Sequence, residues 1–110
     1  MKDKMRYILV KTTYNIDEDP EFFKNLNREL MREIGELNYA DVNPKLMLVL
    51  NDNLFIMKVS LAGFSMLVSA LSFIKKINNK QAAFYTIKSS GTIKALIKNM
   101  KQKEKVSDKE

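Results

Sequence analysis

The stretch AAFYTIKSSGTIKALIKNM, residues 82–100, predicts a strand, a turn and a helix in immediate succession. Residues 84–87 are aromatic or β-branched, and such side chains favour extended backbone. The segment Ser89-Ser90-Gly91-Thr92 interrupts the strand, because glycine tolerates φ > 0 and Ser or Thr can cap a helix. Apolar side chains then recur with helical spacing, which predicts a helix whose buried stripe consists of Ile93, Leu96, Ile97 and Met100.

Three lysines follow another face of this predicted helix, at positions 94, 98 and 101. A hydroxyl-rich turn, a helix N-terminus and a row of lysines therefore lie together. A helix start offers N–H groups and partial positive charge, so this arrangement suits a polyanion. The alternative interpretation is an ordinary strand, turn and helix with a capped start and a solvated basic face.

Charge is unevenly distributed along the 110 residues, whose net charge is +6. Residues 1–43 sum to −2, residues 44–100 to +7 and residues 101–110 to +1. The later part of the fold has one acidic residue against eight lysines, which indicates a polyanionic partner such as nucleic acid or an anionic membrane surface. Solubility is the alternative explanation for these lysines.

The amino-acid composition limits the catalytic and metal-binding chemistry that the chain can perform. The chain has no Cys, which excludes disulfides and is compatible with a reducing compartment, and no His, which removes the commonest general base and metal ligand. The N-terminus shows no signal-peptide pattern. The length predicts one domain over residues 1–100, and the charged residues 101–110 predict a disordered tail or a frayed helix end.

The remaining elements are predicted from periodicity and turn residues. Residues 6–14 predict a central strand, and residues 15–19 a loop. Asp19 and Pro20 predict the start of a helix over about residues 20–37, which is expected to end near Gly35 or Asn38 and to be followed by a loop over residues 38–44. Its buried face is expected to consist of Phe23, Leu26, Leu30, Ile34 and Leu37.

Two apolar runs, residues 45–50 and 54–61, surround Asn51-Asp52-Asn53 and predict a β-hairpin. A second helix is expected from Gly63 or Phe64 to Ile77, with a turn over residues 78–80. Its buried face is expected to consist of Leu67, Ala70, Leu71, Ile74 and Ile77, with Lys75 and Lys76 near its C-terminal end.

The order β-α-β-β-α-β followed by a third helix predicts an α+β sandwich of the ferredoxin-like or RNA-recognition-motif type. Right-handed crossovers place both long helices on one face of a four-stranded antiparallel sheet. The other face is open unless the third helix or a partner covers it. We expect Tyr7 and Phe55 there, but the aromatic-rich consensus for stacking on bases is missing, so sequence-specific readout by stacking is not predicted.

Two other interpretations have less support. The carboxylates of Asp17, Glu18, Asp19 and Glu21 lack a calcium-loop pattern and are explained by a loop and a helix start, so no metal site is predicted. Residues 54–74 contain one charge, Lys58, but the uncharged run is shorter than the roughly 20 residues that a membrane span needs.

Two segments, RYILVK (residues 6–11) and YTIKSSGTIKAL (residues 85–96), resemble the protein component 2 family of ribonuclease P, found in archaea and eukaryotes. The resemblance covers most of residues 5–100, and its most specific part is the segment from Ser90 to Lys94. Residues 60–66 are more apolar than is usual for the family. The lack of long extensions is more similar to archaeal members.

The resemblance implies a non-catalytic subunit of the cytoplasmic ribonucleoprotein that removes the 5′ leader of precursor tRNA. In this family the RNA performs the hydrolysis with Mg²⁺, and the expected partners are that RNA, a barrel-like protein component 3 and other protein subunits. The protein itself is expected to bind no cofactor or metal and no membrane. The absence of His, Cys and convergent carboxylates agrees with a protein without catalytic residues.

We expect RNA phosphates to be contacted by ammonium and guanidinium groups, hydroxyls and backbone N–H groups. The predicted RNA-binding residues are Arg6, Lys11, Lys45, Lys58, Lys88, Ser89, Ser90, Gly91, Thr92, Lys94 and Lys98. Protein contacts are expected at the open apolar sheet face and at the outer face of the first helix, which carries Glu29, Arg32, Glu33 and Glu36.

Two alternative functions remain from the residues alone. A stand-alone ferredoxin-like interaction or ligand-binding regulatory domain would show no RNA affinity and would self-associate through its sheet. A membrane-surface protein would use its basic side and would bind anionic vesicles.

Overall fold

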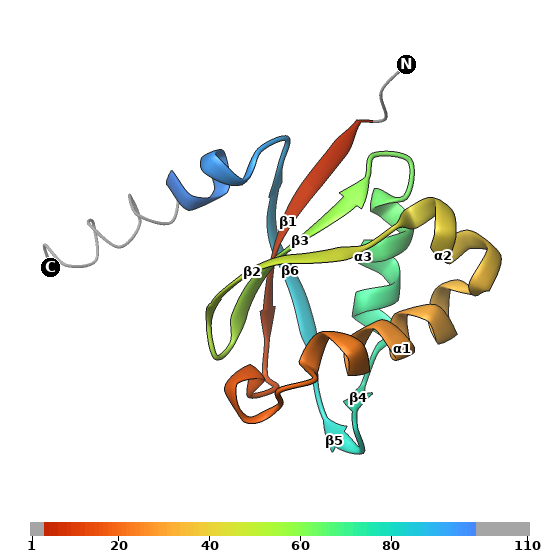
Figure 1. Ribbon diagram of the computed structural model, residues 1–110, viewed down its shortest axis with the longest axis vertical. Coiled ribbons are helices and arrows are strands. Elements are labelled where there is room, and N and C mark those ends of the chain that lie inside the picture. Colours follow the sequence, from red (N-terminus) through yellow and green to blue (C-terminus); the bar gives the residue numbers. More distant parts are fainter. Residues whose placement is uncertain (1–3, 99–110) are drawn as a thin grey trace, which may run out of the picture.

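The computed structural model describes residues 4–98 (Figure 1). Its centre is an antiparallel sheet in the order β2-β3-β1-β6, formed by β1 (Met5–Thr12), β2 (Lys45–Asn51), β3 (Leu54–Ser60) and β6 (Phe84–Ser90). Helices α1 (Phe22–Ile34) and α3 (Phe64–Phe73) pack together on one face of this sheet. The predicted ferredoxin-like α+β sandwich, the central position of the first strand and the hairpin are thereby confirmed. The predictions for Met100, Lys101 and residues 101–110 lie outside the described residues.

The main core lies between the sheet and the helices. Alternate residues of the central strands point into it, including Ile8, Val10, Phe55 and Met57, because successive strand side chains face opposite sides. Phe55 is fully buried there, so the prediction that it lies on the open face was wrong. Its ring packs edge-on against Phe22, with the centroids 5.3 Å apart. The helices contribute apolar faces that include Leu26, Leu30, Leu67 and Leu71.

The first helix ends at Gly35, one of its two predicted end points, and a second helix follows it. Helix α1 ends at Gly35, whose φ of 91° and ψ of 149° suit only glycine. The chain then forms α2 (Glu36–Val42), where a loop had been predicted. Because Gly35 redirects the chain, Leu37 leaves the apolar stripe of α1 and is 89% exposed, against prediction. At the other end of α1, Phe22 is fully buried whereas Phe23 is only partly buried.

Asp19 stabilises the start of α1 without being its N-cap. The helix begins at Phe22, after a short 3₁₀ turn, η1 (Ile16–Glu18). Asp19 accepts hydrogen bonds from the Tyr14 hydroxyl, the Asn25 amide and the backbone N–H of Glu21, at 2.6, 2.9 and 3.0 Å. Burial by itself raises the pKa of Asp19, but these hydrogen bonds and the nearby charge of Lys80 outweigh it and hold the pKa below its usual range. Burial and the bond to Asp19 raise the pKa of Tyr14 to about 12.

The second predicted helix ends four residues early. Helix α3 stops at Phe73, and the next residues form a small hairpin of β4 (Lys76–Ile77) and β5 (Lys80–Gln81). Asn78 and Asn79 have φ of 53° and 67°, which is typical of a tight two-residue hairpin turn. Ile74 and Ile77 are buried as predicted, but they lie outside the helix. Lys75 and Lys76 therefore follow the helix instead of occupying its last turn.

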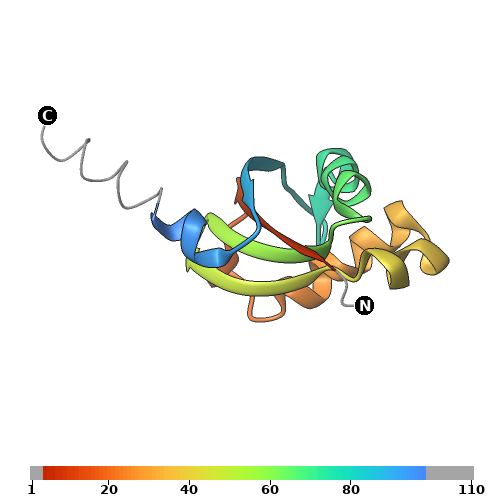
Figure 2. The same cartoon turned by 90° about the horizontal axis from the view of Figure 1, so that it is seen from above.

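A second, smaller core lies on the opposite side of the sheet. Residues 93–98 form a helix there, separated by the sheet from α1 and α3 (Figure 2). Leu96 is fully buried against Leu9 and Ile56, and the partly buried Ile93 and Ile97 pack around them. The predicted apolar stripe of the third helix is thus confirmed up to residue 98. The helix covers the middle of a sheet face whose two ends it leaves accessible.

Candidate nucleic-acid interface

The sheet face opposite α1 and α3 is organised in rows of side chains that cross the strands. Strand register pairs Lys45 with Lys58, Lys58 with Tyr7, and Tyr7 with Ser90, and we call these four residues the basic row. The middle row consists of Leu48, Ile56, Leu9 and Lys88, and it carries the smaller core. The third row, near the β2–β3 turn, consists of Asn51, Leu54, Lys11 and Tyr85, and we call it the hairpin row.

The basic row contains two lysines directly opposite each other. Lys45 is exposed and Lys58 is half-buried, and like charges in this position destabilise a sheet. Within residues 4–98 the ion pairs are Lys24 with Glu21 and Arg32 with Glu29, all on or beside α1. Neither lysine of the row is therefore neutralised by a carboxylate of the described chain. A bound anion would relieve this repulsion.

The turn after β6 is held by its own hydroxyl groups. The backbone N–H of Thr92 donates to Ser90 Oγ at 3.3 Å, and the N–H of Ala95 donates to Thr92 Oγ1 at 3.2 Å. Thr92 thus caps the helix of residues 93–98, as its sequence context predicts. Strand β6 continues through Ser89 and Ser90, so the prediction that the break begins at Ser89 was wrong. The break begins at Gly91.

Most of the predicted RNA-binding residues come together on this side of the molecule. The residues on the face, in the turn or on its helix are Lys11, Lys45, Lys58, Lys88, Ser90, Gly91, Thr92, Lys94 and Lys98. Arg6 and Ser89 do not join them. Arg6 pairs with the core residue Val59, and its guanidinium lies 5.9 Å from the centre of the Phe64 ring on the helix side. Ser89 pairs with Ile8, another residue of the main core.

Tyr85 belongs to this face, although the sequence did not indicate it. Its side chain is 56% exposed and lies in the hairpin row beside Lys11. A bulge in the pairing between β1 and β6, at Leu9 and Val10, changes which residues of β6 face each side. If side chains are assumed to alternate between the two faces along residues 84–90, those on one side of the bulge are therefore assigned to the wrong face. The exposed aromatic next to a lysine is visible only once the register is known.

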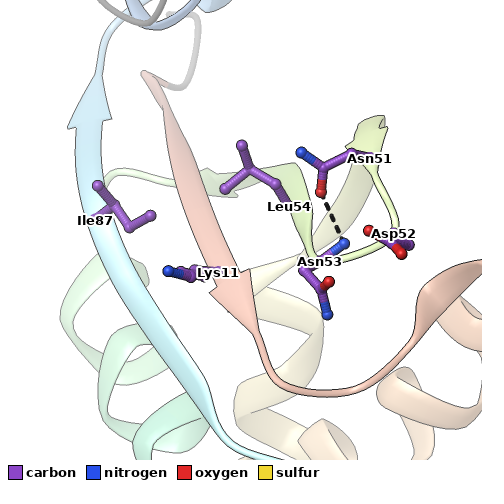
Figure 3. Close-up of a pocket in the computed structure, with 6 residues that line it drawn as sticks. All are labelled: Lys11, Asn51, Asp52, Asn53, Leu54 and Ile87. Carbon is purple, nitrogen blue, oxygen red and sulfur yellow. Dashed lines mark hydrogen bonds between the residues drawn. The ribbon is translucent and has the colours of Figure 1, made fainter. Parts of the chain in front are cut away.

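A cavity of about 520 Å³ lies at the hairpin row (Figure 3). Its lining combines an ammonium group, two amides, a carboxylate and apolar side chains, from Lys11, Asn51, Asp52, Asn53, Leu54 and Ile87. This volume falls within the range of small-molecule sites, about 300–1,000 Å³. In residues 4–98 no group of three or more acidic side chains is arranged to hold a metal ion. In the same range no helix is long and apolar enough to cross a membrane.

The fold and this face define an α+β protein of the ferredoxin-like class with a basic sheet surface. The sequence pattern of the Rpp14/Pop5 family of ribonuclease P proteins matches residues 6–101, so the chain belongs to this family. A chain in the cryo-EM structure of yeast ribonuclease MRP has a similar fold, with a TM-score of 0.65 and 16% identity over 98% of this chain and 97% of that chain. Comparison with curated protein sequences gives no match.

Family membership confirms the resemblance to ribonuclease P protein subunits that the segments around Arg6 and Ser90 indicate. The chain is accordingly a protein subunit of the ribonuclease P ribonucleoprotein, which functions in tRNA processing. Because the yeast chain is only 16% identical, its similarity shows that the two chains share a fold and shows nothing further.

Proposed function

We propose that this subunit supports the catalytic RNA of ribonuclease P by neutralising RNA phosphates along the sheet face opposite α1 and α3. The observation that supports this most directly is the pair of lysines in the basic row. Lys45 and Lys58 lie directly opposite each other without a neutralising carboxylate in the described chain. A protein with only a structural use for this row has no reason to keep two like charges paired.

The electrostatic mechanism follows from the nature of RNA. Each phosphate that a lysine neutralises releases condensed counterions, which favours binding at low salt and lets the RNA pack closely. Lys94 and Lys98 extend the charge onto the helix of residues 93–98, and Lys88 links the rows on β6. The turn at Ser90 and Thr92 holds this helix in place.

The chemistry of the complex is assigned to the RNA in this proposal. The chain has no His or Cys, and its carboxylates do not converge in the described residues. Mg²⁺ would act at the RNA active site, where the complex hydrolyses the phosphodiester that joins the 5′ leader to tRNA. We further propose that this complex works in the cytoplasm, since the absence of Cys from the sequence is compatible with a reducing compartment.

Other protein subunits, including a barrel-like component 3, are proposed to bind the helical side. This side exposes Leu37, Met66 and Phe73, and α1 carries the acidic Glu29 and Glu33, which RNA would repel. The centre of the sheet face, at Leu9 and Ile56, is not available for such a partner, because the helix of residues 93–98 covers it. Of the two arrangements expected for this face, coverage by the third helix is therefore the one found there.

The proposal is tested by the salt dependence of binding to the ribonuclease P RNA of the source cells. The variant is Lys45→Ala/Lys58→Ala, and the matched control is Lys75→Ala/Lys76→Ala, which removes the same charge beyond the end of α3. The first variant should reduce the slope of log K against log salt by about 1–2, since each phosphate contact contributes roughly 0.9. The control should leave the slope close to that of the unmodified chain.

Equal slopes for the two variants would contradict the assignment of the basic row. No affinity of the unmodified chain for this RNA at low salt, alone or together with the other subunits, would refute the proposed function.

A further inference from the structure

The hairpin row differs chemically from the basic row on the same face. It places one lysine, Lys11, between an apolar residue, Leu54, and an exposed aromatic ring, Tyr85. A run of phosphates would require several cations here, and the row supplies one. A flat apolar surface, one cation and a cavity beside them are the features that a nucleotide base and its phosphate require together.

The cavity next to Lys11 has hydrogen-bonding groups at one end and an apolar residue at the other. Ile87 lies at the β6 end, and Asn51 and Asp52 lie at the hairpin end (Figure 3). Asp52 is the only carboxylate between residues 44 and 100, where eight lysines occur. A carboxylate on an RNA-facing surface repels phosphates but accepts hydrogen bonds from the amino groups of bases.

The hairpin end of the cavity is rigidly held. Asn53 donates from its amide to the carbonyl oxygens of Thr12 and Tyr14, at 3.0 and 3.1 Å, which ties the turn to the end of β1. Asn51 Oδ1 accepts from the backbone N–H of Asn53 at 2.8 Å, and the Asn51 amide nitrogen points away from that residue (Figure 3). The site therefore loses little conformational freedom when a ligand binds.

We propose that the hairpin row binds two successive unpaired nucleotides of an RNA strand, with one base stacked on Tyr85, the phosphate between them at Lys11, and the other base in the cavity. The edge of this second base would reach Asn51 and Asp52, so that bases with an amino group are preferred over uracil. This inference rests on the proposed RNA-binding function, because the cavity lies on the same sheet face as the basic row. It adds a second mode of binding, stacking on a single-stranded segment, to phosphate neutralisation.

The test uses the full chain and three fluorescently labelled RNAs. These are a single-stranded nonamer of adenylate, a nonamer of uridylate, and a short RNA stem closed by a loop, compared by titration at one salt concentration. Adenosine 5′-monophosphate serves as an unlabelled competitor. The variants are Tyr85→Ala, the matched control Tyr85→Phe, and Asp52→Asn. Tyr85 and Asp52 lie at the surface, and thermal unfolding of each variant checks that it is folded.

Tyr85→Ala should weaken binding of the adenylate strand about 5- to 100-fold, the range expected for the loss of one base–aromatic stack, and should leave the stem unaffected. Tyr85→Phe should retain the affinity, since its ring can still stack. Asp52→Asn should reduce the preference for adenylate over uridylate.

Equal losses for strand and stem, or no loss with Tyr85→Ala, would overturn the inference and leave the proposed function intact. The same conclusion follows if the unmodified chain binds the stem but not the strands. Binding of adenosine 5′-monophosphate as tightly as the nonamer would show a site for free nucleotides and would overturn the assignment to RNA. If the unmodified chain binds the ribonuclease P RNA but none of these short RNAs, the inference is overturned and the proposed function stands.

Discussion

Replacing Leu96 by alanine is expected to release the helix of residues 93–98 from the sheet. Leu96 is fully buried, and its partners Leu9 and Ile56 are 5% and 0% exposed. A buried Leu→Ala change costs about 2–5 kcal/mol through lost burial and the cavity that remains. The neighbouring Ile93 and Ile97 are only partly buried, so the helix can shift inward. We therefore expect a value near the lower end, about 2–3 kcal/mol.

Leu96 is the fully buried residue of this helix within residues 93–98, so the smaller core depends on it for holding these residues on the sheet. Urea unfolding would measure the loss of stability, and amide hydrogen exchange would show whether residues 93–98 lose protection before the sheet does. Leu67→Ala is the matched comparison, because Leu67 is equally buried in the main core. This change should lower global stability by about 3–5 kcal/mol without selective loss at residues 93–98.

A cost below about 1 kcal/mol for Leu96→Ala, with unchanged protection of residues 93–98, would refute this reasoning. It would mean that the smaller core does not hold the helix on the sheet. Selective loss of protection would instead predict weaker RNA binding by the same variant, because Lys94 and Lys98 depend on this helix for their position.

Three further predictions concern other parts of the fold. Gly63→Ala should destabilise the chain by about 1–3 kcal/mol in urea unfolding, since the new Cβ would lie 2.7 Å from Val42 Cα, whereas Gly91→Ala, whose Cβ meets nothing within 4 Å, is the control with little effect. Lys58→Met should raise the melting temperature of the free chain at low salt, because it removes the repulsion from Lys45, while it weakens RNA binding; a lower melting temperature would contradict this. The folded chain keeps the Tyr14 proton up to a pKa of about 12, against an ordinary value of 10.0. Stability should therefore be retained below pH 10 and fall as the pH rises from 10 to 12, and Tyr14→Phe should reduce this loss in pH-dependent unfolding.

Much of the architecture was predictable because it depends on local patterns. Apolar spacing and turn residues indicated the strands, both long helices and the hairpin, and the order of elements left few possible topologies. The same spacing predicted most core residues of α1 and α3, and the segment around Ser90 indicated the family to which the chain belongs. These features depend on residues that are close together in the sequence, so they can be predicted without knowledge of the tertiary structure.

The exceptions occur where backbone geometry overrides periodicity. Gly35 adopts a conformation that ends α1 and starts α2, and this moved Leu37 from the expected core to the surface. The apolar pattern of the second helix continued through Ile77, but Ile74 and Ile77 lie beyond its last residue, and Ile77 belongs to β4. Helical spacing predicted that each of these residues is both helical and buried. Leu37 is helical but exposed, whereas Ile74 and Ile77 are buried but not helical, because packing against distant parts of the chain overrides the local pattern.

The sequence by itself determined the order of the four sheet strands and the two long helices, the family, the excess of lysine after residue 44 and most of the basic residues of the interface. Only the tertiary structure decided which residues share a face. Strand pairing brings Lys45 opposite Lys58, a bulge places Tyr85 beside Lys11, and Arg6 faces the helices instead. The physical reason is that a shift of one residue in register moves every side chain of a strand to the other face, and register is set by contacts between distant parts of the chain.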